Sequence, residues 1–221
     1  MERIYCLLIG YLLGMFQTAY FYGKAKGIDI RQHGSGNAGT TNTLRVLGRK
    51  AGLIVFFGDV LKCMLAIFIA YWIFGESHSD SIYLLKIYAA MGAILGHNFP
   101  FYLGFKGGKG IAATAGMVVA LHWQFLPVAA VVFFTVFFIT HYVSLGSLVL
   151  YTVFVIQLII SGQLGVYGMN QNLLFEMYAV GVFLAVMAFV KHRANIKRLI
   201  KGTESKTYLS KKKKEEAAKA V

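Results

Sequence analysis

The sequence predicts an all-α integral membrane protein. Of its 221 residues, 57% are hydrophobic and only 14% are charged, and the mean hydropathy is +0.63. This composition lies outside the range of soluble globular domains. Apolar runs near the roughly 20 residues that a helix needs to cross a bilayer core recur along the chain. We therefore expect a polytopic protein with seven transmembrane helices, its N-terminus outside and its C-terminus in the cytoplasm.

Length and hydropathy define six of these spans directly. In chain order they are 4–22, 51–73, 82–98, 124–142, 144–162 and 173–191. The first is not read as a signal peptide, because it lacks a basic start and a small-residue cleavage site. The remaining segment, 111–122, holds about 12 residues, which rise only about 18 Å as a helix. We expect a short or tilted helix there.

The orientation follows from the distribution of basic residues. With seven spans, loops 23–50 and 99–110 and the tail share one side, and of the loops on the other side only 1–3 carries a cation, Arg3. Lysine and arginine concentrate on the cytoplasmic side of membrane proteins. Merging 111–142 into one helix would separate the tail from the other basic loops, so we reject six spans. We expect one membrane domain over 1–200 and a basic cytoplasmic tail over 201–221.

Charges and cysteines limit the possible functions further. The net charge of +13 would suit either anionic lipids or nucleic acid, and the hydropathy favours lipids, so no nucleic-acid partner is expected. Cys6 and Cys63 lie in apolar stretches, which indicates neither a disulfide framework nor a zinc site. Asp59 and Lys62 are three residues apart within one span, so they share a helix face and are expected to form a structural ion pair.

Three polar segments fall on the cytoplasmic side of this topology. The first, 31–45, mixes three glycines with hydroxyl and amide side chains and ends in Arg45; it is either a flexible loop or a loop that wraps an anion. The second, 96–110, carries Lys106 and Lys109 among glycines and leads into a helix start, which favours anions. It is not a nucleotide-binding P-loop, because Gly110 follows Lys109.

The third segment, 191–204, is expected to continue the last span as a helix. His192, Asn195 and Arg198 would then lie on one face. The lysines beyond it are typical of a topology anchor. Together the three segments place phosphate-binding groups on one membrane face with almost no competing carboxylate, which predicts a site for phosphorylated substrates at the lipid boundary.

Three stretches carry a resemblance to a known family: GSGNAGTTN with Arg45, GHNFPFYLGFKGGKG, and HRANIKRLIKGTE. They resemble the signature motifs of the bacterial acyl-phosphate:glycerol-3-phosphate acyltransferases, the PlsY family, in order and spacing along essentially the whole chain. Thr40, where the family often has alanine, and the lysine-rich tail depart from that pattern. The resemblance implies an inner-membrane enzyme with a cytoplasmic active site that acylates the 1-hydroxyl of glycerol 3-phosphate, giving lysophosphatidic acid for phospholipid synthesis. Fatty acyl phosphate would be the acyl donor, and membrane lipids would surround the enzyme.

The histidines distinguish this chain from the other glycerolipid acyltransferases. Those enzymes use a histidine with an aspartate five positions later, and none of the six histidines here has one. No carboxylate cluster is able to hold magnesium either, so we expect no metal and no cofactor.

From these segments we assign candidate residues to two roles. Lys109 and Arg45 would hold phosphates, Asn195 and Lys109 would stabilise the oxyanion, and His192 or His97 would act as a base or as structural hydrogen-bonding groups. Ser147 would bind phosphate or simply pack between helices. The catalytic candidates are Lys109, Asn195, His192, Arg45 and Ser35; the substrate-binding candidates are Gly36, Asn37, Thr41, Asn42, His97, Lys106, Gly107, Gly108, Ser147, Arg198 and Glu204.

Two functions from other classes compete with this interpretation. A carrier for an organic phosphate anion could use the basic loops as a vestibule, but it would need polar residues near the membrane midplane, where Asp59 and Lys62 are the main ones. A non-enzymatic anchor could bind anionic lipids through the tail.

Overall fold

Helices make up the regular structure of the protein in the computed structural model, which describes residues 1–208. The ten α-helices of this part of the chain are α1 (Glu2–Gly14), α2 (Thr18–Ala25), α3 (Thr40–Leu47), α4 (Arg49–Phe74), α5 (Ile82–Asn98), α6 (Ile111–Leu121), α7 (Phe125–Thr140), α8 (Val143–Gln163), α9 (Gln171–Lys191) and α10 (Arg193–Ile200). Two 3₁₀ turns, η1 (Ile30–Gln32) and η2 (Phe101–Leu103), lie in the connections.

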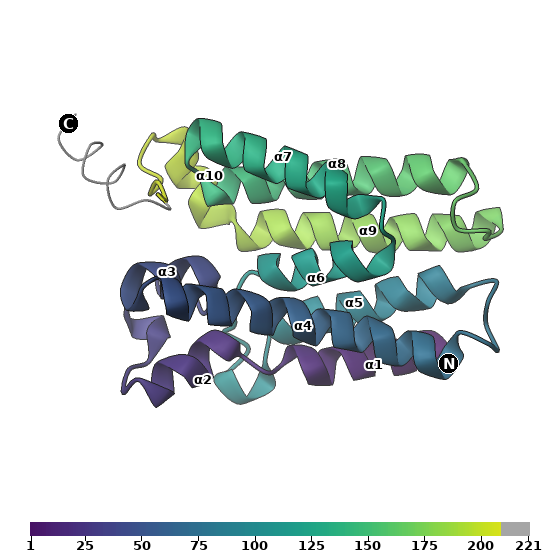
Figure 1. The fold of residues 1–221 in the computed structure, drawn as a ribbon, viewed down its shortest axis with the longest axis horizontal. Coiled ribbons are helices and arrows are strands. Elements are labelled where there is room, and N and C mark those ends of the chain that lie inside the picture. The colour runs from purple at the N-terminus through teal and green to yellow at the C-terminus, as the bar shows by residue number, and fades with distance from the viewer. Residues whose placement is uncertain (209–221) are drawn as a thin grey trace.

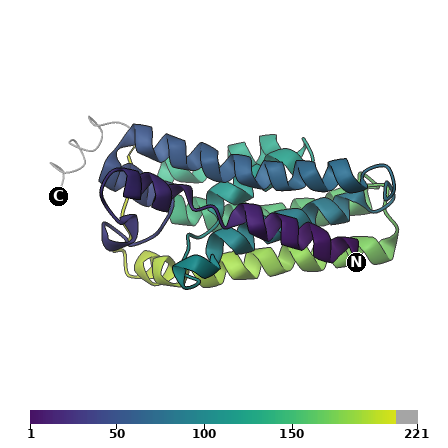
Figure 2. The same cartoon turned by 90° about the horizontal axis from the view of Figure 1, so that it is seen from below.

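The long helices run side by side in two layers (Figure 1). Helices α1, α4 and α5 form one layer, α7, α8 and α9 form the other, and α6 lies between them. The short helices α2, α3 and α10 gather at one end, while the N-terminus and connections 75–81 and 164–170 lie at the opposite end (Figures 1 and 2). All three polar segments of the sequence therefore meet at one end of the bundle.

Close packing of α1 against α5 depends on glycines in both helices. Gly10 and Gly14 face α5, and a Cβ at either position would collide with the backbone of Ala89 or Ala93. Gly92 and Gly96 face α1 in the same way. Such pairs four residues apart let two membrane helices approach until their backbones touch.

Helix lengths confirm four of the expected spans in the described part of the chain. The segments long and apolar enough to cross a membrane are Glu2–Ala25, Arg49–Phe74, Val143–Gln163 and Gln171–Lys191. Helix α5 has the expected bounds, and α6 is short and separate from α7, as expected. The first of these segments, Glu2–Ala25, is interrupted within its length, because α1 ends at Gly14 and α2 begins at Thr18.

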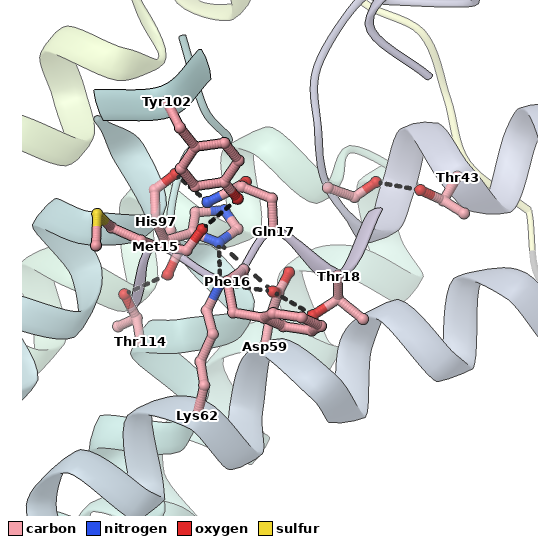
Figure 3. Close-up of polar contacts among 12 residues, drawn as sticks. Met15, Phe16, Gln17, Thr18, Thr43, Asp59, Lys62, His97, Tyr102 and Thr114 are labelled. Carbon is pink, nitrogen blue, oxygen red and sulfur yellow. Dashed lines mark hydrogen bonds and ion pairs between the residues drawn. The ribbon is translucent and has the colours of Figure 1, made fainter. Parts of the chain in front are cut away.

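The break between α1 and α2 exposes backbone carbonyls that other residues satisfy. The hydroxyl of Tyr102 donates to the carbonyl of Met15 at 2.7 Å, and the ammonium of Lys62 donates to the carbonyl of Phe16 at 2.8 Å (Figure 3). Gln17, in the break, donates through Nε2 to the carbonyl of His97 at 2.9 Å. A break at membrane depth is tolerated when neighbouring groups replace the lost helical hydrogen bonds.

A second lysine performs a similar task at the end of α6. This helix ends at Leu121, well before its neighbours do (Figure 1). Lys86 of α5 donates to the carbonyl of Leu121 at 3.0 Å. Cations near a helix C-terminus satisfy its last carbonyls and interact favourably with its dipole.

Candidate active site

The second and third polar segments meet through Lys109 and Asn195. Lys109 lies in the loop before α6, and its ammonium donates a hydrogen bond to Oδ1 of Asn195 on α10. Lys109 is half-buried, and burial lowers the pKa of its amine to about 8, although nearby Glu204 opposes this. A partly desolvated cation beside a polar amide is a suitable partner for a phosphate or an oxyanion.

Glu204 accepts hydrogen bonds from three side chains of α8 and α10 around this contact. Its Oε1 accepts from Nδ2 of Asn195 at 2.6 Å and from the hydroxyl of Ser144 at 2.8 Å, and its Oε2 accepts from Nε of Arg198 at 2.6 Å. Burial would raise the pKa of Glu204, but these hydrogen bonds outweigh it and lower the pKa. The ionised carboxylate therefore orients a cation and an amide.

Arg45 approaches the same cluster from α3. Its guanidinium donates to the carbonyl of Ser205 at 3.1 Å and to the hydroxyl of Thr207 at 2.9 Å. Thr207 is itself held by a backbone hydrogen bond to the carbonyl of His141 at 2.9 Å. Desolvation lowers the pKa of Arg45, and the charges of Glu204 and Arg198 also act on it. Part of the expected tail, 203–207, thus packs against the site; the lysines at 211–214 lie outside the described residues.

His192 lies between α9 and α10 rather than within one continuous helix. It is 2% exposed, and its Nδ1 is 2.8 Å from the carbonyl of Ala188. Because a carbonyl only accepts, Nδ1 carries a proton in this contact. Burial, followed by the charge of Lys109, lowers the pKa of His192 to about 4. At neutral pH its Nε2 is therefore an unprotonated acceptor.

The first polar segment is only partly a loop, which corrects the sequence interpretation. Its second half forms α3, so Thr41, Asn42 and Arg45 are helical residues. Asn42 is 1% exposed and closes the preceding loop: Nδ2 donates to the carbonyls of Ile30 (3.1 Å) and His33 (2.9 Å), and Oδ1 accepts from the Ser35 amide (2.8 Å). Asn42 thereby shapes the loop for its neighbours.

The remaining candidates of this segment lie closer to the surface. Ser35 and Gly36 are exposed at the tip of the loop, and Gly36 has a φ of 71°, which a residue with a side chain rarely adopts. Asn37 and Thr41 are partly exposed. These four residues, called the rim below, lie on the loop whose Ala38 carbonyl packs against Gly108 or at the start of α3.

In the glycine loop before α6, residues 107–110, two backbone amides form hydrogen bonds within the protein. The amide of Gly107 donates to the carbonyl of Asn98 at 3.2 Å, and that of Gly108 donates to the carbonyl of His97 at 3.1 Å. These two amides are therefore engaged, and a Cβ on Gly108 would collide with the His97 ring and with the carbonyl of Ala38. The glycines allow close packing beneath Lys109, while Lys106 is exposed.

The structure gives different contacts to Ser147, which the sequence indicated as a candidate, and to Ser144, which it did not. Ser147 is 1% exposed and donates to the carbonyl of Val143 within α8, which favours a packing role. Ser144, one turn earlier, contacts Glu204 instead. Reasoning from the sequence also missed Thr207 and the contact of His97 with Lys62; no spacing pattern links those residues.

Among the described residues, the site combines three cations with one carboxylate. Lys109, Arg198 and Arg45 surround Glu204, and Asn195 and His192 supply neutral polar groups. Excess positive charge in a partly desolvated setting attracts a phosphate-bearing ligand. The fold and this cluster define an integral membrane protein with a group of cations at one end of its helix bundle.

Comparison with known proteins identifies the family. A family model described as glycerol-3-phosphate acyltransferase matches residues 4–202. Glycerol-3-phosphate acyltransferase 2 from a strain of Bacillus cereus is 41% identical over 209 residues, which cover 94% of this chain and 96% of that protein. The glycerol-3-phosphate acyltransferase of Alkaliphilus metalliredigens is 40% identical over 211 residues, covering 93% and 96%. The chain belongs to the glycerol-3-phosphate acyltransferase family.

Solved structures agree with this assignment. PlsY, an integral membrane glycerol 3-phosphate acyltransferase crystallised in a glycerol 3-phosphate form, matches with a TM-score of 0.80 and 33% identity, over 94% of this chain and 96% of that one. Its lysophosphatidic acid form matches with a TM-score of 0.79 and 31% identity, over the same shares of the two chains.

Proposed function

We propose that this protein transfers a fatty acyl group from acyl phosphate to the 1-hydroxyl of glycerol 3-phosphate, yielding lysophosphatidic acid and inorganic phosphate. The observation that carries this proposal is the linked cluster of Lys109, Asn195, Glu204 and Arg198, with Arg45 beside it. Both substrates and both products are anions that such a cluster attracts. Relatives named for this acyltransferase activity, and related structures in glycerol 3-phosphate and lysophosphatidic acid forms, support it.

Lys109, Arg198 and Arg45 would bind the phosphate groups of the two substrates. Arg45 would exchange its contacts with Ser205 and Thr207 for a phosphate, to which its planar fork is well matched. Ser35, Thr41 and Asn37 would donate from the rim, next to Gly36, and Lys106 would add charge. Holding two reactants in the correct orientation is worth about 7–11 kcal/mol at best.

The groups around Lys109 would promote the acyl transfer itself. The substrate hydroxyl adds to the acyl carbonyl, the oxygen of that carbonyl becomes negative, and Lys109 and Asn195 stabilise it by about 3–4 kcal/mol per well-placed donor. The carbonyl re-forms as the C–O bond to phosphate breaks. The hydroxyl proton passes to Nε2 of His192 or to the departing phosphate, whose oxygens are themselves acceptors.

The membrane topology completes the proposal. Seven spans, the first interrupted between α1 and α2, would place the N-terminus outside and α3, α10 and the glycine loop in the cytoplasm. The basic loops gather at that end of the bundle (Figure 1), which supports this orientation by the positive-inside rule. We propose a single membrane domain over 1–200 in the bacterial inner membrane, surrounded by lipid and followed by a basic tail.

A direct assay tests the reaction and the donor together. The protein, purified in detergent or lipid, is incubated with glycerol 3-phosphate and either palmitoyl phosphate or palmitoyl-CoA, without added metal. We expect lysophosphatidic acid from palmitoyl phosphate alone. Product only from palmitoyl-CoA would overturn the donor assignment, and accumulation of glycerol 3-phosphate in proteoliposomes without product would support the carrier function instead.

A further inference from the structure

A second polar cluster lies deeper in the bundle, behind the candidate site. Lys62 of α4 is buried, with its side chain 6% exposed, and its ammonium contacts three acceptors: Asp59 Oδ1 at 2.8 Å, the Phe16 carbonyl at 2.8 Å and Nδ1 of His97 at 2.8 Å (Figure 3). An ammonium group has three N–H donors and no acceptor. All three donors are used, so the position of the ammonium is fixed.

This arrangement also fixes the ring of His97. Because an ammonium only donates, Nδ1 of His97 accepts from Lys62 at 2.8 Å, and the neutral ring carries its proton on Nε2; Asp59 Oδ1 lies farther from Nδ1, at 3.5 Å. Asp59 is held in turn by the hydroxyl of Thr18 at 3.0 Å. The buried charges of Asp59 and Lys62 compensate each other, as buried ion pairs require.

His97 connects this cluster to the loop that carries Lys109. Its backbone carbonyl accepts from Gln17 Nε2 at 2.9 Å and from the amide of Gly108 at 3.1 Å. Its ring lies where a side chain on Gly108 would be, so ring and loop are in direct contact. Lys109 is the next residue, and it reaches Asn195 from there.

We propose that Lys62 is a positioning residue: through His97 it holds the glycine loop 107–110 in place and thereby aims Lys109 at the reacting groups. The inference rests on the role given to Lys109 in the proposed function. The ion pair of Asp59 and Lys62 then supports the site in addition to stabilising the bundle locally. Supporting residues of this kind affect a reaction without touching the substrate.

Two variants remove this support in different ways. The double variant Lys62→Met with Asp59→Asn removes the ammonium together with its buried counter-charge. His97→Leu keeps the ion pair but cannot accept from Lys62, so it decides the question should the double variant not assemble. Lys86→Met is the matched control. Lys86 also donates to a backbone carbonyl within the bundle, but its partner is Leu121, away from the C-terminal end of α5 where His97 lies.

Two readouts are needed, one of them independent of catalysis. The first is kcat/KM for lysophosphatidic acid formation. The second is the pH dependence of acetylation of Lys109 by acetic anhydride, followed by peptide mapping; in the wild-type protein half-labelling should lie near pH 8. Thermal melting and size-exclusion profiles verify that each variant is folded.

We expect His97→Leu and the double variant to lower kcat/KM at least tenfold. Half-labelling of Lys109 should move upward by at least half a pH unit, because a loosened loop hydrates the amine. Lys86→Met should stay within twofold of the wild type with unchanged labelling. Folded variants whose Lys109 labels as in the wild type would overturn the inference. A wild-type protein that makes no lysophosphatidic acid would overturn the proposed function instead, and labelling would still test the support of Lys109.

Discussion

The ammonium of Lys109 donates a hydrogen bond to the side-chain oxygen of Asn195, across 86 positions of sequence. This contact links the glycine loop before α6 to the short helix α10. On its other side Asn195 donates to Glu204, so its amide is oriented by a cation on the oxygen and an anion on the nitrogen. The pair therefore has a fixed geometry before any substrate arrives.

Replacing Lys109 by alanine should lower kcat/KM by roughly 10²–10³-fold, the range found when one donor to a developing oxyanion is removed. The folded state should persist, because Lys109 is half-buried and its partner Asn195 keeps the contact with Glu204. Steady-state kinetics with palmitoyl phosphate measures the effect, with thermal melting as the control. Less than a fivefold loss in a folded variant would contradict the role of Lys109.

Activity should depend on pH through the same amine. Burial lowers the pKa of Lys109 from 10.5 to about 8; Glu204 opposes this shift, and Arg198, Arg45 and Lys191 add to it. The charged form is present below that pH and is lost as pH rises through it. We therefore expect kcat/KM to fall above about pH 8, and the limb for kcat to lie higher, because a bound phosphate favours the ammonium.

Lys109→Arg provides the control for this pH dependence. A guanidinium stays charged throughout the range, so the alkaline limb should move well above its wild-type position even if overall activity is lower. An unchanged limb in this variant would assign the titration to another group.

The long helices were predictable because hydropathy, averaged over several helical turns, indicates whether a segment lies in lipid. The expected span 51–73 corresponds to α4, and 173–191 to α9, within a few residues. The break after Gly14 was not predictable in this way, since Met15 and Phe16 are as apolar as a helix interior. Gln17, whose side chain bonds to His97 across the bundle, was the one local sign of it.

The site shows the same division between local and long-range information. Residue types and spacing indicated Lys109, Asn195, Arg198 and Glu204 as phosphate-site residues, and the structure brings these four together. Which of them touch could not be deduced, because the contacts depend on how α6, α8 and α10 pack. The pairing of Asp59 with Lys62 follows from one helix face and is confirmed, whereas the third member, His97, comes from another helix.

Glu204→Gln should lower kcat/KM by about 10–100-fold by weakening the orientation of Asn195 and Arg198. Glu176→Gln is the matched control: Glu176 accepts from Arg3, next to the N-terminus, at 2.6 and 2.8 Å, and the N-terminus lies at the opposite end of the bundle from α10 (Figure 1). Each substitution removes one charge from an arginine pair. Equal losses of activity in both variants would show that Glu204 acts through general stability rather than through the site.

His192 offers a test that separates catalysis from structure within one side chain. Burial lowers its pKa to about 4, so it is neutral at pH 7, with Nδ1 bonded to the carbonyl of Ala188 and Nε2 available as an acceptor. His192→Asn can keep the donor to Ala188 but lacks the Nε2 position, whereas His192→Gln places a polar atom near Nε2 and loses the donor. If Nε2 accepts the proton of the attacking hydroxyl, His192→Asn should lower kcat at least tenfold while its melting temperature stays near that of the wild type. His192→Gln should lose a similar share of kcat, because a carboxamide cannot accept a proton at neutral pH, and should also melt at a lower temperature. A His192→Asn variant with kcat close to that of the wild type would assign the histidine a structural role and leave the departing phosphate as the proton acceptor.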